Sequence, residues 1–386
     1  MLGRIRTFGF KTRLDRRAER ISDPVERLRF LRREMAISSV QPPPVRTRNS
    51  RALQYAGWLG IFVILPLATA PTPKGAAETM ARERGLLVPR ADAAVNLPST
   101  VSRVWLVEHS ESTEVYSNGL RVDLTFTVSN RPRSSFPVYA LTGAYTPVKT
   151  GQAPVGILYH MNESNLAPFE EEATRKLKRF GRYALETIRQ ERAYHYVIDR
   201  FGRVFSVVAE SDAANHAGNS IWADSEGIYI NLNDSFIGVS FEGQTASSEE
   251  VTPAQILSAR TLTEMLRSRY GIVPENCVTH AQVSVNPLNM HIANHTDWAS
   301  NFPFLSLGLP DNYAIPLPSL YAFGFEFDDV FLRVMGGRWK GLNLAVEQME
   351  RQAAVEHVPV AQYRAMLRHR YKDIAAALKN ESEGGS

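Results

Sequence analysis

Residues 153–310 alternate short apolar runs with longer amphipathic segments, and this alternation restricts the fold class more than any other feature of the chain. Each apolar run is five or six residues long and rich in Val, Ile, Tyr and Phe, as strands are. We expect strands at 155–159, 194–198, 204–208 and 236–241. Because such strands alternate with helical segments, the region is expected to be an α/β domain.

Two helices within this region have clear sequence signals. Residues 169–192 repeat apolar side chains at helical spacing. A second helix is expected over 253–270, because Thr252 is a good N-cap and Pro253 suits the first helical position. Gly271 then favours a left-handed residue that ends the helix.

The segment before the domain has the period of a strand. Residues 122–128 alternate apolar and polar side chains, and Asn118-Gly119 ahead of them indicates a hairpin. Residues 101–150 are therefore expected to form a small β module or an N-terminal extension of the next domain.

The segment after the domain is helical in pattern. Two helices are expected at 341–356 and 360–378, separated by Pro359. Residues 324–380 should therefore form a C-terminal helical segment, and nothing in it indicates chemistry.

The N-terminal 52 residues are strongly basic, with 14 Lys and Arg against five Asp and Glu, although the whole chain carries only +4. An uncharged stretch follows as far as Lys74, and about 20 such residues span a bilayer core. Basic flanks stay in the cytoplasm. We therefore expect a cytoplasmic arm at 1–52, an N-terminal transmembrane helix at 53–73 in the cytoplasmic (inner) membrane, and an extracytoplasmic linker at 74–100.

Two other interpretations of the N-terminus exist. Ala68-Thr69-Ala70 resembles the cleavage site of a signal peptide, but the basic region before it is far too long. Nucleic-acid binding would also use a basic arm. Membrane topology explains these arginines more simply, so no nucleic-acid partner is expected.

Cysteine occurs once, at Cys277, which excludes an internal disulfide framework and a Cys-based zinc finger. This residue is expected to be a small buried hydrophobe. Any metal must therefore be bound by histidine and carboxylate side chains.

Six of the nine histidines fall between residues 160 and 295. His160 ends an apolar strand, where α/β sheets place their sites, and His280 ends another apolar stretch. With Asp297 they would supply two imidazoles and one carboxylate, leaving a fourth zinc position for water. By spacing alone, a structural role remains the alternative for each histidine. His195 is expected to be structural, because strand alternation turns it away from Tyr194.

Seven blocks within 153–305 resemble, in order, the zinc-dependent N-acetylmuramoyl-L-alanine amidase family, which includes peptidoglycan recognition proteins. The blocks read ILYH at 157–160, YHYVIDRFG at 194–202, HAG at 216–218, NDSFIGV at 233–239, TPAQ at 252–255, TH at 279–280 and HTD at 295–297. The resemblance implies a mixed central β-sheet flanked by helices and a zinc amidase domain over 151–310.

The resemblance also implies roles for single residues. His160, His280 and Asp297 align with the zinc ligands of the family. Tyr194 and His295 align with groups that stabilise the oxyanion formed when water attacks the amide.

The sequence departs from the family at His295 and at Ser240. His295 stands where the family usually has Lys, and Ser240 where some members have Glu. Glu242, on the same strand face as Ser240, is a possible proton acceptor. His291 is the alternative third ligand if the loop is shifted, and His216 is expected to shape the substrate groove.

Together these features predict a membrane-anchored zinc amidase that hydrolyses the amide bond between N-acetylmuramic acid and L-alanine. Its expected partners are peptidoglycan or muropeptides, with the catalytic domain outside the cytoplasmic membrane. The alternative is a non-catalytic peptidoglycan-binding protein of the same fold. A scaffold role for the basic arm and the C-terminal helices is compatible with either.

Overall fold

The computed structural model describes residues 102–141, 146–245, 250–335 and 338–384. The predicted cytoplasmic arm, transmembrane helix and linker fall on residues 1–100 and lie outside this part of the chain. Within the described ranges, no helix is both long enough and apolar enough to cross a membrane.

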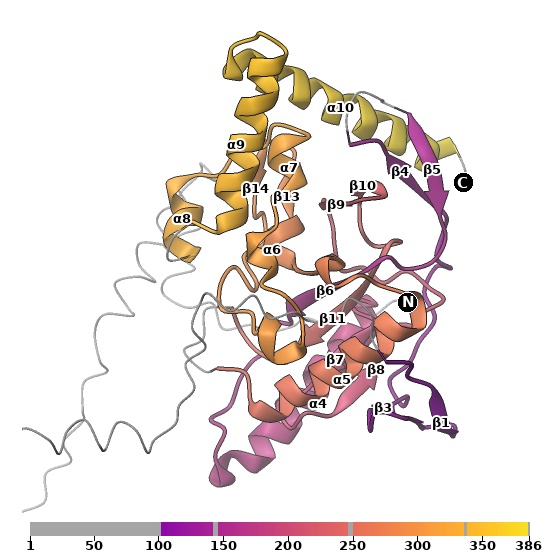
Figure 1. Ribbon diagram of the computed structural model, residues 1–386. Coiled ribbons are helices and arrows are strands. Elements are labelled where there is room, and N and C mark those ends of the chain that lie inside the picture. The colour runs from indigo at the N-terminus through magenta and orange to yellow at the C-terminus, as the bar shows by residue number, and fades with distance from the viewer. Residues whose placement is uncertain (1–101, 142–145, 246–249, 336–337, 385–386) are drawn as a thin grey trace, which may run out of the picture. The chain divides into compact units, whose positions relative to one another are not determined.

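An eight-stranded mixed sheet forms the centre of the domain (Figure 1). Its strand order is β1-β2-β3-β8-β7-β11-β6-β12. The strands nearest the site are β6 (Gly156–Met161), β7 (Tyr196–Ile198), β8 (Val204–Ser206), β11 (Phe236–Phe241) and β12 (Cys277–Thr279). β11 runs parallel to β6 and β7, β12 runs parallel to β6, and β8 is antiparallel to β7. The predicted α/β class with a mixed central sheet is confirmed.

The N-terminal strands extend this same sheet. They are β1 (Leu106–His109), β2 (Thr113–Tyr116) and β3 (Arg121–Asp123), and β3 pairs in parallel with β8. The strand expected over 122–128 ends at Asp123. The Oδ1 atom of Asp123 accepts hydrogen bonds from the N–H (2.8 Å) and the hydroxyl (2.6 Å) of Thr125, which turns the chain.

A second sheet contains four strands in the order β5-β4-β10-β9. Its members are β4 (Phe136–Tyr139), β5 (Pro147–Gly151), β9 (Ile221–Asp224) and β10 (Gly227–Ile230). Strands from the N-terminal extension therefore pair with strands from within the α/β domain.

Helices cover opposite faces of the central sheet. These are α4 (Thr174–Glu191), which follows the short 3-10 helix η1 (Glu171–Ala173), and α5 (Pro253–Tyr270). Ile198 shares a buried cluster with Leu262 of α5, whereas Val197 shares one with Leu185 of α4. Successive strand residues point to opposite faces, so the two helices enclose β7 between them.

The helix α5 begins and ends where the sequence predicts. The Thr252 hydroxyl accepts a hydrogen bond from the Gln255 N–H at 3.1 Å, and the Gln255 side chain accepts one from the Thr252 N–H at 3.0 Å. At the other end, Gly271 adopts the left-handed conformation with φ of 67°. This capping box and the glycine fix both ends of the helix.

The C-terminal segment packs against the loops that follow β12 (Figure 1). Its elements are η3 (Phe304–Leu307), η4 (Asn312–Ala314), α7 (Pro318–Tyr321), α8 (Asp329–Met335), α9 (Lys340–Val355) and α10 (Val360–Gly384). Trp339 and Ile374 belong to the same buried cluster as Val285 and Ala299. The C-terminal helices thus share one hydrophobic core with residues of the α/β domain.

Candidate metal centre

His160 and His280 meet because two parallel strands end side by side. His160 lies near the carboxyl end of β6, and His280 begins the short helix α6 (His280–Val283) directly after β12. Thr279 of β12 is the register partner of Tyr159 of β6. The next residue in each strand direction is a histidine, so His160 and His280 come to lie side by side. The centroids of the two imidazole rings are 4.5 Å apart.

Asp297 completes a three-residue cluster with these histidines. Its Oδ1 atom is 2.9 Å from His280 Nδ1, and its Oδ2 atom is 3.3 Å from His160 Nδ1. One nitrogen or oxygen from each residue lies within 4.8 Å of the others, and all three side chains are buried. The structure therefore brings together the three residues that the resemblance assigns as ligands.

The chemistry of this donor set fits zinc. Burial, together with the nearby His280, lowers the pKa of His160 to about 4. Burial alone would raise the pKa of Asp297, but the hydrogen bonds from His160 and His280 outweigh it and hold this pKa well below its usual range. Near neutral pH His160 is therefore a neutral imidazole and Asp297 a carboxylate, which are the protonation states that coordination requires of them.

His295 stacks on His280, with ring centroids 4.5 Å apart and an angle of 15° between the planes. Its backbone is held by Ser284, whose hydroxyl accepts from the His295 N–H at 3.0 Å and donates to the His295 carbonyl at 3.1 Å. Burial and the neighbouring His280 lower the pKa of His295. The side chain therefore offers a neutral ring N–H near pH 7.

Tyr194 lies on the other side of the cluster, with its ring centroid 5.0 Å from that of His160. Burial and the charge of Asp297 raise the pKa of Tyr194 above its ordinary value. The phenol therefore keeps its proton near neutral pH. A pocket of about 190 Å³ opens beside Tyr194, between α4 and the loop after β6.

The carboxylate of Glu242 forms its hydrogen bond away from the cluster of His160, His280 and Asp297. It accepts a hydrogen bond from the Arg200 N–H at 3.1 Å and lies against Gly181 of α4. Ser240 is buried and is the register partner of His160. The position where some family members have a carboxylate therefore holds a hydroxyl here.

Three other histidines of this region lie outside the cluster of His160, His280 and Asp297. His291 lies on β14 (His291–Ile292), with its Nδ1 atom 3.6 Å from Asp328. His195 is fully buried, and its Nδ1 atom accepts a hydrogen bond from the Gly238 N–H at 2.9 Å. His216 is 7% exposed and contacts His160, so it is buried beside the cluster and does not line an open groove.

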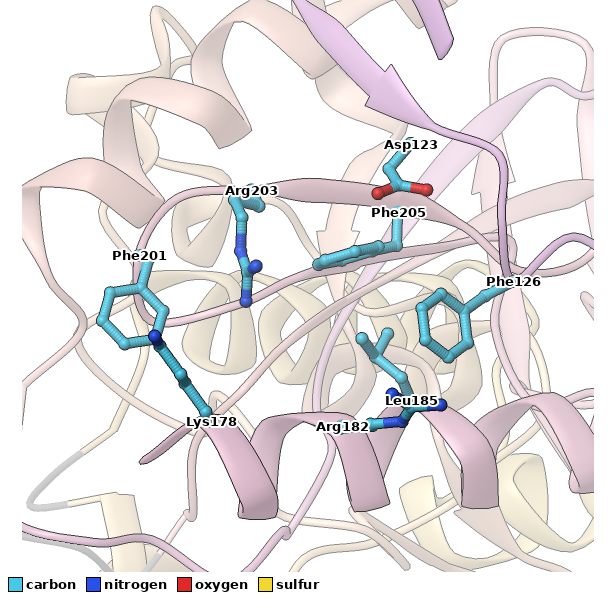
Figure 2. Close-up of a pocket in the computed structure, with 8 residues that line it drawn as sticks. All are labelled: Asp123, Phe126, Lys178, Arg182, Leu185, Phe201, Arg203 and Phe205. Carbon is cyan, nitrogen blue, oxygen red and sulfur yellow. The ribbon is translucent and has the colours of Figure 1, made fainter. Parts of the chain in front are cut away.

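A second pocket, of about 460 Å³, lies away from these residues (Figure 2). Phe126 and Phe205 meet edge to face in it, and Arg203 lies over the rings of Phe201 and Phe205. The Arg203 guanidinium is already paired with Asp199. This pocket contains none of the predicted site residues.

Sequence and structure comparisons identify similar proteins. Residues 152–299 match the family described as N-acetylmuramoyl-L-alanine amidase. The amidase AmiD of Escherichia coli K12 is 33% identical over 89 residues, which cover 21% of this chain and 31% of AmiD. The alignment thus spans about a third of the length of that curated relative.

Solved structures of related proteins give weaker matches. An amidase, LysC of Clostridium intestinale, is 20% identical over 47% of this chain and 92% of its own, with a TM-score of 0.27. E. coli AmiD in complex with anhydro-N-acetylmuramic acid-L-Ala-D-γ-Glu-L-Lys is 20% identical over 51% of this chain and 65% of its own, with a TM-score of 0.31.

The family match covers His160, His280 and Asp297 together, so the clustered residues and the matched residues are the same part of the chain. This chain therefore contains a domain of the N-acetylmuramoyl-L-alanine amidase family, over residues 152–299.

Proposed function

We propose that this protein is a zinc-dependent amidase that hydrolyses the bond between N-acetylmuramic acid and L-alanine in peptidoglycan. The observation that carries the proposal is the buried cluster of His160, His280 and Asp297 inside the family match. Zinc bound there would supply a Lewis acid that polarises the amide carbonyl and activates water.

The residues around the cluster have complementary tasks in this proposal. Asp297, His160 and His280 would hold the ion. Tyr194 and His295 flank the cluster from two sides and each retain a proton near neutral pH. In this proposal their O–H and N–H groups stabilise the oxyanion that forms at the carbonyl, a contribution that grows as charge develops.

The pocket beside Tyr194 is the proposed site of the peptide. It is lined by polar residues of the loop after β6, among them Asn162 and Ser164, and by residues of α4. A muropeptide whose scissile carbonyl lies at the cluster would place its stem peptide or its sugar against this surface. The polar side chains that line this pocket can form hydrogen bonds with the amides of the stem peptide or with the acetamido group of the sugar.

We also propose that the domain acts outside the cytoplasmic membrane. The motivation is the uncharged stretch at 53–73 after a basic arm, which favours a single span with the N-terminus in the cytoplasm. Peptidoglycan lies on the far side of that membrane, where the domain would then be.

The test measures zinc content and muropeptide hydrolysis on the full-length chain. Wild type should bind one equivalent of zinc and release peptides that begin with L-Ala. His280→Ala should lose both, whereas His369→Ala, an exposed side chain in α10, should keep both. A wild-type protein without zinc would contradict the ligand assignment.

A second candidate function is peptidoglycan binding without turnover. The observation that favours it is His295, because a neutral imidazole stands where the resemblance gives a Lys. In the same experiment, wild type that binds zinc and muropeptides but releases no peptide would establish this alternative.

A further inference from the structure

The pocket of about 460 Å³ is formed by three segments of the chain (Figure 2). Lys178, Arg182 and Leu185 come from one face of α4, because they are four and three residues apart. Phe205 of β8 and Phe126, from the segment after β3, line its other side. The volume is typical of pockets that bind small molecules. No residue of the proposed metal centre lines it.

The inner wall of this pocket is apolar. Leu185 and Phe205 are only 4% and 3% exposed and belong to one buried cluster, against which Phe126 packs. The rings of Phe126 and Phe205 meet edge to face, with centroids 5.6 Å apart. An apolar group of a ligand that lies against this wall is removed from water, and the gain in free energy grows with the area that is buried.

The rim of the pocket, where its lining residues face solvent, is positively charged. Lys178, Arg182 and Arg203 are all exposed. Asp123 is the one acidic residue that lines the pocket, and its Oδ1 atom already accepts two hydrogen bonds from Thr125. Three cations against one carboxylate favour a ligand with a negative charge.

The existing contacts of these cations leave hydrogen-bond donors for such a ligand. Within the part of the chain that the structure describes, no carboxylate forms an ion pair with Lys178. Arg182 pairs with Glu186 at 2.8 Å, but the two side chains are 76% and 48% exposed, and exposed pairs are weak. Arg203 contacts Asp199 through Nε and Nη2, which leaves the N–H groups of Nη1.

We propose that this pocket binds a small amphipathic anion. Its apolar chain or ring would lie against Phe126 and Phe205, and its one carboxylate or phosphate group would lie at Lys178, Arg182 and Arg203. A sugar would find few hydrogen-bond partners at the apolar wall, and an amine would meet like charges at the rim. This site goes beyond the amidase proposal, and binding to it does not require zinc.

Protection of Lys178 from acetylation measures this binding in the full-length chain. The chain, in nanodiscs of phosphatidylcholine, is treated with an amine-acetylating reagent, and mass spectrometry compares Lys178 with Lys372, an exposed lysine of α10. Octanoate and octyl phosphate should protect Lys178 saturably and leave Lys372 unchanged. Octyltrimethylammonium, which has the chain and the opposite charge, should not protect, nor should inorganic phosphate, which lacks the chain. Equal protection by octyltrimethylammonium and octanoate, or none by either anion, would overturn the proposal.

Two single substitutions on α4 separate the pocket from the overall charge of the helix. Arg182→Gln and Arg179→Gln each remove one exposed positive charge, but only Arg182 lines the pocket. Arg182→Gln should weaken the protection of Lys178 by octanoate several-fold, whereas Arg179→Gln should behave as wild type. Because both side chains are exposed, both variants should fold. Equal losses would mean that the anion responds to the charge of the helix as a whole, and the proposal would fail.

The length of the ligand chain tests the apolar wall. From butanoate to octanoate, each added methylene should tighten binding by up to about fourfold, which corresponds to the transfer of one CH₂ group out of water. Affinity that does not depend on chain length would refute an apolar site. Dihexanoyl-phosphatidylglycerol and octanoate represent the two sources of such a ligand, a membrane lipid and a free acid, and the tighter binder identifies the source. Zinc content is measured on the same samples, so failure of this proposal leaves the amidase proposal intact.

Discussion

Trp339 donates its indole N–H to the carbonyl oxygen of Ala299 at 2.9 Å, although the two residues are 40 positions apart in the chain. Ala299 is two residues beyond Asp297. Tyr313, which stacks on Trp339 at 5.0 Å, donates its hydroxyl hydrogen to the carbonyl of Trp298 at 2.7 Å. The C-terminal segment therefore fixes the backbone of the loop that carries the third proposed ligand.

Trp339→Phe should loosen this loop. The substitution leaves the buried Ala299 carbonyl without its donor, which costs about 1–3 kcal/mol of unfolding free energy. Zinc affinity should also fall several-fold, because Asp297 is held less firmly. Urea denaturation and chelator competition measure the two effects. Trp105→Phe, at a side chain that is 56% exposed, should change neither. Reduced stability with unchanged zinc affinity would show that the loop keeps its shape without Trp339.

Acid should destabilise the zinc-free protein in a defined range. The pKa of His160 is lowered from 6.5 to about 4, so between these values the unfolded chain binds a proton that the folded chain does not. The free energy of unfolding therefore falls as the pH drops from about 6.5 to about 4, and rises again as the pH is raised. The lowered pKa values of His195 and His216 act in the same direction.

Removing the imidazole of His160 should make the free energy of unfolding less dependent on pH. In His160→Gln, the slope of unfolding free energy against pH should decrease by at most about 1.4 kcal/mol per pH unit. Urea denaturation of chelator-treated protein at several pH values between 4 and 7 measures it. The exposed substitution His369→Gln is the control. An unchanged slope in His160→Gln would mean that His160 binds its proton equally well in both states.

His295 can be tested separately from zinc binding. If its ring N–H stabilises the oxyanion, His295→Ala should lower kcat by roughly 100-fold and leave zinc affinity unchanged. His295→Lys, which supplies the donor that the family usually has, should retain much more of the activity. Steady-state hydrolysis of a muropeptide gives kcat for both variants. His291→Ala is the control, since His291 pairs with Asp328 outside the cluster. A wild-type rate in His295→Ala would exclude the donor role.

Thr252→Ala should affect stability but not the site. It removes the hydroxyl that accepts from Gln255 and donates to the Arg200 carbonyl at 2.9 Å, so the free energy of unfolding should fall by about 0.5–2 kcal/mol. Thr261→Ala is the matched control, because the Thr261 hydroxyl bonds only to carbonyls of its own helix. Chemical denaturation measures the free energy of unfolding of both variants. Equal decreases in the two would argue against a capping role for Thr252.

Much of the domain could be predicted because its signals are local. The caps of α5 and the apolar strands β6 and β11 depend on neighbouring residues in the sequence, and the structure has them where expected. The extended strand expected over 122–128 was wrong, because the side chain of Asp123 bonds to Thr125 and turns the chain. Turn chemistry here outweighed the alternation of apolar residues.

The surroundings of the site could not be predicted in the same way. The three proposed ligands were predicted from ordered motifs. The place of His216, in contrast, depends on the absence of a side chain at Gly238, 22 positions later in the sequence. The bond from Trp339 to Ala299 joins segments with no shared pattern. Contacts of this kind follow from packing between distant segments, which leaves no periodicity in the sequence.

The position of β12 links the metal centre to the edge of the sheet. β12 has three residues, ends the strand order and pairs within that sheet only with β6. Any fraying of this short strand would carry His280 away from His160 and separate the two imidazoles. An ion held between them would stabilise the pairing of β12 with β6. The amide hydrogens of β12 should therefore exchange with solvent more slowly when zinc is bound. Metal binding and the local stability of the edge strand β12 would then be thermodynamically linked, and zinc affinity and hydrogen exchange would both report that linkage.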